Sequence, residues 1–211
     1  MPLQNRVTPF GTLIATPERG TLMGNRGCLH DKARHIRRTF QLQRWIICLL
    51  DFKGRSREVM RPGHYTELFF LDEATALAAG HRPCAECQRR RFDLFRETWA
   101  IANPEFTDRE KPRATTIDAV LHNERIRAKS FCDSIDGLPN GTFLSDNACD
   151  AYVVLNGKLR LWTPGGYEIG PSTRLSFPAR ILTPSSVVKT LCKGYTAAFH
   201  GSAFDEPHAV D

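Results

Sequence analysis

The feature of this sequence that most constrains its fold is a pair of cysteines, Cys84 and Cys87, which follow the turn Gly80-His81-Arg82-Pro83. A CxxC turn directs backbone N–H groups toward two sulfurs, which suits half of a zinc site or a thioredoxin-like redox pair. The redox interpretation requires the pair to follow the first strand of a βαβ unit, whereas a helical segment and a glycine turn precede it here. The spacing therefore favours zinc, with a redox pair or ordinary thiols as the alternatives.

The other cysteines and the hydropathy pattern limit where such a site can occur. The 211 residues contain seven cysteines, an odd number that lacks the density of a secreted disulfide scaffold. The longest strictly apolar run, residues 45–50, is far shorter than the roughly 20 residues of a bilayer span, and the first 30 residues contain no signal-peptide core. We therefore expect a cytoplasmic protein with no membrane partner.

Local patterns predict short elements on the N-terminal side of the cysteine pair. Residues 45–52 are compact, apolar and β-branched at their start, which predicts a buried strand with residues 57–60 as its hairpin partner. Residues 66–71 predict another strand. Asp72 is the expected N-cap of a helix over residues 73–79, which a glycine ends.

After the cysteine pair, residues 88–101 place Phe92, Phe95 and Trp99 on one face of an amphipathic helix. Residues 102–115 are polar and contain prolines, which indicates a linker or loop.

The remaining residues predict a second part of the chain. Thr116 is expected to cap a helix, and Asn156-Gly157 joins two strand-like runs in a type I′ hairpin over residues 152–162. Thr183 and Pro184 are expected as the N-cap and first residue of a last helix. The prediction is an α+β protein: a small mixed sheet with helices around a structural zinc site over residues 1–101, the linker 102–115, and a β-rich C-terminal part of unknown role over residues 116–211.

The run from Glu67 to Cys87 contains an aromatic strand, an alanine-rich helix with an acidic cap, and Ala79-Gly80-His81-Arg82-Pro83 before the cysteines. This order resembles the Ada-type zinc-binding domain, which is the metal-binding module of the Ada alkylation-repair protein and of related modules attached to nucleases. The resemblance is close over residues 64–90 and loose over residues 22–63. It implies that Cys84 and Cys87 are two of four zinc ligands.

The resemblance places the other two ligands upstream, after a Gly-Asn turn. No CxxxC pair exists in this chain, but Gly24-Asn25 leads to Cys28 and His30. The expected ligand set for Zn²⁺ is Cys84, Cys87, Cys48 and His30, with Cys28 as the substitute for His30. Two alternatives stay open: Cys48 can equally be a small core residue within its apolar strand, and His30 a surface or phosphate-contacting histidine.

Positive charge is concentrated in the first half of the chain. Residues 1–99 hold 17 Lys and Arg against 10 Asp and Glu, a formal charge of +7, whereas residues 100–211 carry −1. The window 26–61 alone accounts for +7, which is typical of a protein that binds a phosphate backbone; a solvated basic face is the alternative. The candidate nucleic-acid contacts are Arg26, Arg34, Arg37, Arg38, Lys53, Arg55, Arg57, Arg82, Arg89 and Arg90.

These features together predict a zinc-containing, nucleic-acid-associated protein, with DNA as the expected nucleic acid and DNA repair or processing as the role that the resemblance implies. One alternative is a nuclease- or glycosylase-type enzyme with a structural zinc, whose acid/base candidates are His64, Tyr65 and Glu67, or His122 with Glu124. The last two residues are two apart on a predicted helix and so do not share a face. The second alternative is a zinc-stabilised scaffold that binds protein. Catalytic residues are left unassigned.

Overall fold

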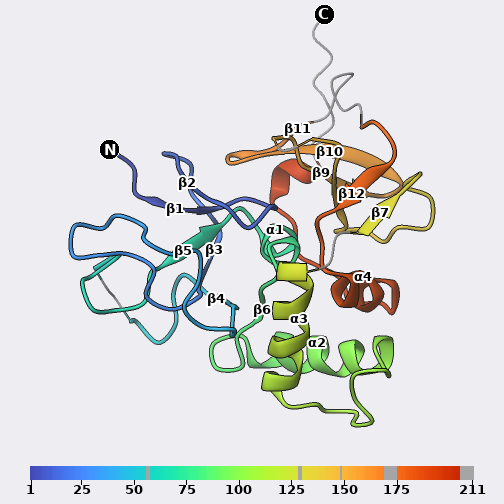
Figure 1. The fold of residues 1–211 in the computed structure, drawn as a ribbon, viewed down its shortest axis with the longest axis horizontal. Coiled ribbons are helices and arrows are strands. Elements are labelled where there is room, and N and C mark those ends of the chain that lie inside the picture. Colours follow the sequence, from blue (N-terminus) through green and yellow to red (C-terminus); the bar gives the residue numbers. More distant parts are fainter. Residues whose placement is uncertain (56–57, 128–129, 148, 169–174, 205–211) are drawn as a thin grey trace, which may run out of the picture.

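A computed structural model describes residues 1–55, 58–127, 130–147, 149–168 and 175–204. Its described residues form two six-stranded sheets and four α-helices, which agrees with the predicted α+β class. Figure 1 shows the N-terminal sheet on one side of helix α1 and the C-terminal sheet on the other, with α2, α3 and α4 grouped below.

The N-terminal sheet is mixed, as predicted, and has the strand order β2-β1-β5-β3-β4-β6. The β1–β5 and β4–β6 pairs are parallel, and the other three neighbours are antiparallel. Its strands are β1 (Gln4–Val7), β2 (Leu13–Ala15), β3 (Leu22–Asn25), β4 (Ile46–Cys48), β5 (Leu68–Phe70) and β6 (Arg82–Pro83).

The C-terminal sheet is antiparallel throughout, in the order β11-β10-β9-β8-β12-β7. The predicted hairpin is confirmed: Asn156 and Gly157 both have positive φ, +51° and +68°, as a type I′ turn requires. The strands are β7 (Ser130–Cys132), β8 (Phe143–Ser145), β9 (Tyr152–Leu155), β10 (Lys158–Thr163), β11 (Gly166–Glu168) and β12 (Ala179–Ile181).

Two helices follow their predicted signals. In α1 (Glu73–Ala78) the Asp72 side chain accepts a hydrogen bond from the Thr75 N–H at 2.8 Å, and Gly80 has φ +79° just beyond the helix. Helix α2 (Arg89–Ala102) buries the expected apolar stripe, Phe92, Phe95 and Trp99. These capping and periodic signals are local, and the tertiary structure retains them.

Other boundaries differ from the predictions. The strand predicted over residues 45–52 is limited to β4, and its antiparallel partner is β3 rather than residues 57–60. Residue 57 lies outside the described residues. Helix α3 (Ala114–Arg127) begins before Thr116, so this threonine lies inside the helix and does not cap it.

The last helix, α4 (Ser185–Cys192), also has a different N-terminus from the predicted one. Its N-cap is Pro184, whereas the Thr183 hydroxyl accepts a hydrogen bond from the Phe143 N–H at 2.8 Å. The capping acceptor comes from α3: the Glu124 carboxylate accepts bonds from the Ser186 N–H at 2.8 Å and from its hydroxyl at 2.6 Å. Thr183 instead connects the start of β8 to the segment after β12.

The buried apolar side chains of residues 1–101 and 116–211 form one continuous core, which runs from Val7 to Ala203. Helix α1 also bonds to the C-terminal residues through its acidic side chains. Asp72 accepts hydrogen bonds from the Tyr167 hydroxyl at 2.7 Å and from the His200 N–H at 2.9 Å. Glu73 accepts one from the Tyr195 hydroxyl at 2.5 Å.

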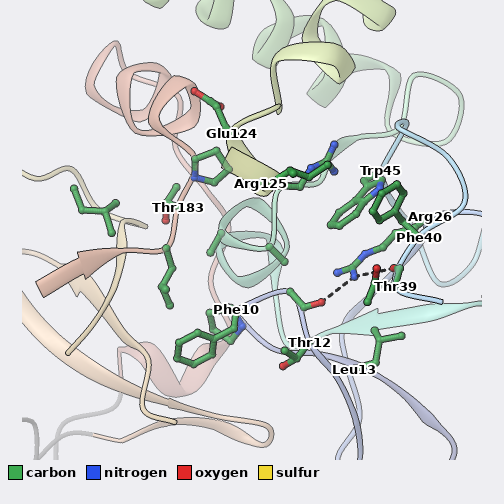
Figure 2. A pocket seen from close by; sticks show the side chains of 18 of the residues that line it. Phe10, Thr12, Leu13, Arg26, Thr39, Phe40, Trp45, Glu124, Arg125 and Thr183 are labelled. Atoms are coloured by element: carbon green, nitrogen blue, oxygen red, sulfur yellow. Dashed lines mark hydrogen bonds between the residues drawn. The ribbon is translucent and has the colours of Figure 1, made fainter. Parts of the chain in front are cut away.

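Two cavities border the N-terminal sheet. One, of about 450 Å³, lies between the loops of this sheet and the segment from β12 to α4, and it includes Trp45 and Thr183 (Figure 2). The other, of about 680 Å³, lies beside Cys48, Cys84 and Cys87. No helix among the described residues is long and apolar enough to cross a membrane.

Candidate metal centre

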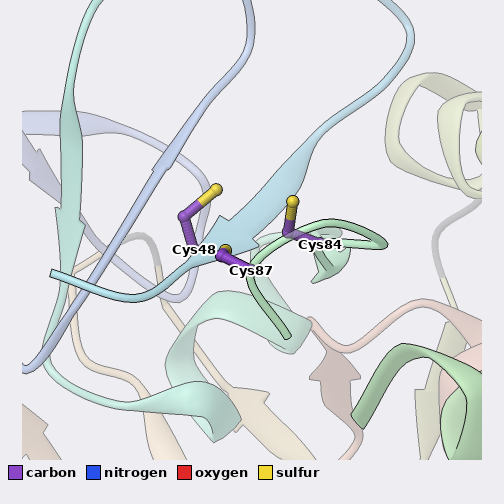
Figure 3. Close-up of side chains that lie close together, drawn as sticks. All are labelled: Cys48, Cys84 and Cys87. Carbon is purple, nitrogen blue, oxygen red and sulfur yellow. The ribbon is translucent and has the colours of Figure 1, made fainter. Parts of the chain in front are cut away.

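Three cysteine side chains come together at the edge of the N-terminal sheet. The sulfur atoms of Cys48, Cys84 and Cys87 all lie within 4.8 Å of one another (Figure 3). Cys48 and Cys84 are buried, and Cys87 is half-buried. Three of the four residues predicted as ligands are therefore neighbours in the structure.

The pairing of β4 with β6 produces this arrangement. The two strands run parallel, with Ile46 beside Arg82 and Ile47 beside Pro83, so the next residues, Cys48 and Cys84, are adjacent at the ends of both strands. The Cys84 N–H continues the ladder by donating to the Ile47 carbonyl at 2.9 Å. The turn into α2 then brings Cys87 back toward the same point.

Contacts among the three thiols, together with burial, shift their pKa values. A hydrogen bond with the Cys48 thiol lowers the pKa of Cys84 to about 5, with further bonds from backbone N–H groups, including the Glu86 N–H at 3.4 Å. The same interaction with Cys84 raises the pKa of Cys48, and burial adds to this increase. Burial also raises the pKa of Cys87. Cys84 is thus the most acidic of the three thiols.

The donor set fits a thiophilic cation. A tetrahedral zinc ion with Zn–S bonds of about 2.3 Å holds its thiolates about 3.8 Å apart. The sulfur separations of up to 4.8 Å therefore need to contract by about 1 Å at most. A cation at the centre would also neutralise the thiolates, which otherwise repel one another.

The predicted fourth ligand, His30, is not in this cluster. Its Nδ1 lies 2.6 Å from the Thr66 hydroxyl and its Nε2 lies 3.3 Å from the Arg61 carbonyl, so both ring nitrogens are used to join two loops. The substitute, Cys28, is also elsewhere, because its thiol donates to the His30 carbonyl at 3.7 Å. Among the described residues, the group around this point that could hold a metal ion thus contains only the three cysteines.

The 680 Å³ cavity beside the thiols is lined by side chains of β3, β4 and β5 that point to one face of the sheet, and by the loop after β4. The apolar ones include Met23 of β3 and Phe69 of β5, and the acidic ones include Glu67 and Glu86. Sequence reasoning did not predict this cavity. The one local sequence feature that relates to this cavity is the period-two alternation along β5. Leu68 and Phe70 are buried, while Phe69 faces away from the core.

Two of the predicted nucleic-acid contacts are buried, and for them the prediction of surface contacts does not hold. Arg82 has 2% of its surface exposed and forms two hydrogen bonds of 2.9 Å with the Asp118 carboxylate of α3. Arg26 has 1% exposed; its Nε donates to His81 Nε2 at 3.1 Å and its Nη1 to the Gly11 carbonyl at 2.8 Å. Both arginines are held inside the protein.

The other candidate contacts lie nearer the surface. Arg34, Arg37, Arg55 and Arg89 are ion-paired with Glu58, Asp31, Glu86 and Asp93, respectively. In the part of the chain that the structure describes, Arg38, Lys53 and Arg90 are exposed and have no carboxylate partner within 4 Å. Arg57 lies outside the described residues.

Three of the acid/base candidates, Glu67, Glu124 and His122, form hydrogen bonds or ring contacts that hold parts of the fold together. Glu67 is buried, and its Oε2 accepts a bond from the Met60 N–H at 2.8 Å. Glu124 caps α4, as described above, and His122 forms an edge contact with Phe40 at 5.0 Å between ring centroids. Glu67 also borders the cavity beside the thiols, but His122 and Glu124 lie away from it.

Comparisons with protein-family models, with curated proteins and with solved structures found no significant match to this chain.

Proposed function

We propose that Cys48, Cys84 and Cys87 bind one Zn²⁺ ion, and that the chain is a nucleic-acid-associated zinc protein of the Ada type, with DNA as its nucleic acid. The observation that supports the metal is the convergence of three sulfurs from two separate segments within 4.8 Å. Thiolates select soft or borderline cations, and zinc is the common tetrahedral choice for such donors.

Elemental mass spectrometry of tag-free protein tests the metal site. Wild type is expected to hold one zinc per chain, and Cys48→Ser, Cys84→Ser and Cys87→Ser are each expected to lose it. Cys192→Ser is the matched control, because Cys192 is an exposed cysteine outside the cluster and should leave the zinc content unchanged. A folded wild type with no stoichiometric metal, or variants that retain it, would contradict the proposal.

Charge supports the nucleic-acid part of the proposal. Residues 1–99 carry +7, and Arg38, Lys53 and Arg90 present exposed cations with no carboxylate partner among the described residues. Such side chains can replace the counterions that surround a nucleic-acid backbone, so binding should weaken steeply as salt rises.

Titration of duplex and single-stranded DNA at several salt concentrations tests this part. Each of Arg38→Gln, Lys53→Gln and Arg90→Gln is expected to reduce the slope of log affinity against log salt by about one, because each substitution removes one cation that can pair with a phosphate. Lys158→Gln is the control, because it removes the same charge from an exposed position in the C-terminal sheet. If no binding occurs even at low salt, the protein-interaction scaffold becomes the better explanation.

A second candidate function, an enzyme that acts on nucleic acid or nucleotides, is favoured by one observation. The three thiols border a cavity of about 680 Å³, and zinc sites with three protein ligands and one accessible position are typical of catalysis rather than of structural support. Cobalt-substituted protein tests this: its visible spectrum should change when azide or imidazole is added if the fourth position is accessible. An unchanged spectrum would indicate a closed, structural site.

A further inference from the structure

The 450 Å³ cavity between the two parts of the chain contains an unusual concentration of arginines. Arg26 comes from the end of β3, Arg125 from α3 and Arg180 from β12, and all three line the cavity. Among the described lining residues, Glu124 is the only carboxylate, and its oxygens are bonded to Ser186. The ionisable groups around the cavity therefore have a formal charge of +2.

Each of these arginines has a buried N–H group that no protein atom satisfies. In the described part of the chain, Arg26 Nη2, Arg125 Nε and Arg180 Nε are buried and have no hydrogen-bond partner. Leaving a buried charged donor unpaired is costly, and native structures rarely do so without a ligand, an ion or water. All three donors belong to residues that line one cavity, which makes this cavity a candidate site for an acceptor.

Backbone carbonyls and an indole ring hold two of the guanidinium groups in place. Arg125 donates from Nη1 to the Gly80 carbonyl at 2.9 Å and from Nη2 to the Gln43 carbonyl at 3.0 Å. The guanidinium carbons of Arg26 and Arg125 lie 3.9 Å and 3.8 Å from the ring centroid of Trp45 (Figure 2). The site is thus preorganised, because these contacts fix the donors before any ligand arrives.

This arrangement lowers the pKa of two of the arginines. Burial and the positive charge of Arg125 lower the pKa of Arg26 to about 9. Burial also lowers the pKa of Arg125 to about 9. An anion in the cavity would offset both effects, because it would add negative charge to that of Asp118 and Glu124, whose carboxylates only partly counter the burial of Arg125.

We propose that this cavity binds a small organic phosphate monoester, with the phosphate on Arg26, Arg125 and Arg180 and an apolar or aromatic body against Phe10 and Phe40. A phosphate monoester carries nearly two negative charges at neutral pH, which matches the +2 of the cavity better than a carboxylate does. Each guanidinium keeps one nitrogen without a protein acceptor, and N–H···O bonds between a guanidinium and a phosphate are charge-assisted and strong. The volume is in the range of small-ligand pockets, and this site is separate from the three cysteines.

Calorimetric titration with phenyl phosphate, in phosphate-free buffer, tests the proposal. Wild type is expected to bind it with one site per chain, more tightly than inorganic phosphate and at least tenfold more tightly than phenol. Arg125→Gln and Arg180→Gln are each expected to weaken binding at least tenfold. Lys158→Gln should leave binding unchanged, because it removes the same charge from an exposed residue remote from the cavity lining.

If Arg125→Gln folds poorly, thermal unfolding of a second variant, Arg125→Lys, tests the proposal instead. Arg125→Lys retains the charge but loses the Nε donor that has no protein acceptor, so phenyl phosphate should raise its unfolding temperature less than that of wild type. The absence of saturable binding to wild type, or equal binding of phenol, would overturn the proposal. Equal affinity of Arg180→Gln and wild type for phenyl phosphate would also overturn the proposal. Arg180→Gln should also keep the salt dependence of DNA binding, which separates this site from the proposed nucleic-acid surface.

Discussion

The ion pair between Arg82 and Asp118 is expected to be among the most sensitive points of the fold. It joins β6, which leads directly into Cys84, to the middle of α3. Both side chains are almost completely buried, with 3% and 8% exposed, and the pair is bidentate with two N–H···O distances of 2.9 Å. Replacing Asp118 with asparagine would leave a buried guanidinium without a counter-charge, with the Pro83 carbonyl and one amide oxygen as its acceptors.

We predict that Asp118→Asn lowers the free energy of unfolding by about 3–5 kcal/mol. Two hydrogen bonds to charged groups contribute about 1.5–3 kcal/mol each, and removing one partner of a buried pair typically costs about 3–5 kcal/mol, which lies within the sum of the two bonds. The double variant Arg82→Met, Asp118→Leu removes both charges and keeps apolar contact with Phe92, whose ring lies 5.0 Å from the guanidinium. It should therefore be more stable than Asp118→Asn.

Urea unfolding at a fixed zinc concentration measures these changes, because a bound metal adds to stability by mass action. Glu97→Gln is the control: it breaks an exposed pair with Lys111 and should change stability by less than about 0.5 kcal/mol. A loss of less than about 1 kcal/mol in Asp118→Asn would refute the reasoning, since it would mean that Arg82 is solvated. Arg82 would then again be a candidate contact to a nucleic-acid phosphate.

Three further predictions concern single side chains. Glu124→Ala should cost about 1–2 kcal/mol, because the Ser186 N–H at the start of α4 loses its acceptor, and amide hydrogen exchange should be faster in that helix. Gly80→Ala should cost about 1–2 kcal/mol in urea unfolding, because φ is +79° and a Cβ there would lie 2.4 Å from Arg125 Cδ; it should also weaken phenyl phosphate binding. His81 is completely buried, and burial, followed by the charges of two nearby arginines, lowers its pKa well below 6.5. The unfolded chain therefore binds a proton below about pH 6.5 that the folded chain does not, so stability should fall as pH drops through this range, and less steeply in His81→Gln.

Several elements were predictable because their signals act between neighbouring residues. The N-cap Asp72, the stripe of Phe92, Phe95 and Trp99 and the Asn156-Gly157 turn are all found as predicted. Each depends on a side chain and a backbone within a few residues of each other, or on a helical period of 3.6. Long-range contacts reinforce these preferences without having to create them.

The candidate metal centre was only partly predictable. Cys84 and Cys87 follow from their spacing, and Cys48 was a candidate from the apolar strand upstream, but only the parallel register of β4 and β6 shows that its sulfur lies beside the other two. No sequence feature near His30 indicates which residues its ring contacts. Its ring bonds to Thr66 and to the Arg61 carbonyl depend on how two loops pack together.

The arginines show most clearly which properties depend on long-range packing. By sequence alone Arg26, Arg82 and Arg38 are equivalent members of a basic region. In the fold Arg38 is exposed, Arg82 is neutralised by an aspartate 36 residues away, and Arg26 lies in a cavity with arginines from α3 and β12. The amount of charge and the local elements can be predicted from the amino-acid sequence. Whether a given charge is solvated, paired or left facing a cavity depends on distant segments that meet only when the core forms, because electrostatic energy depends on burial and on the nearest opposite charge.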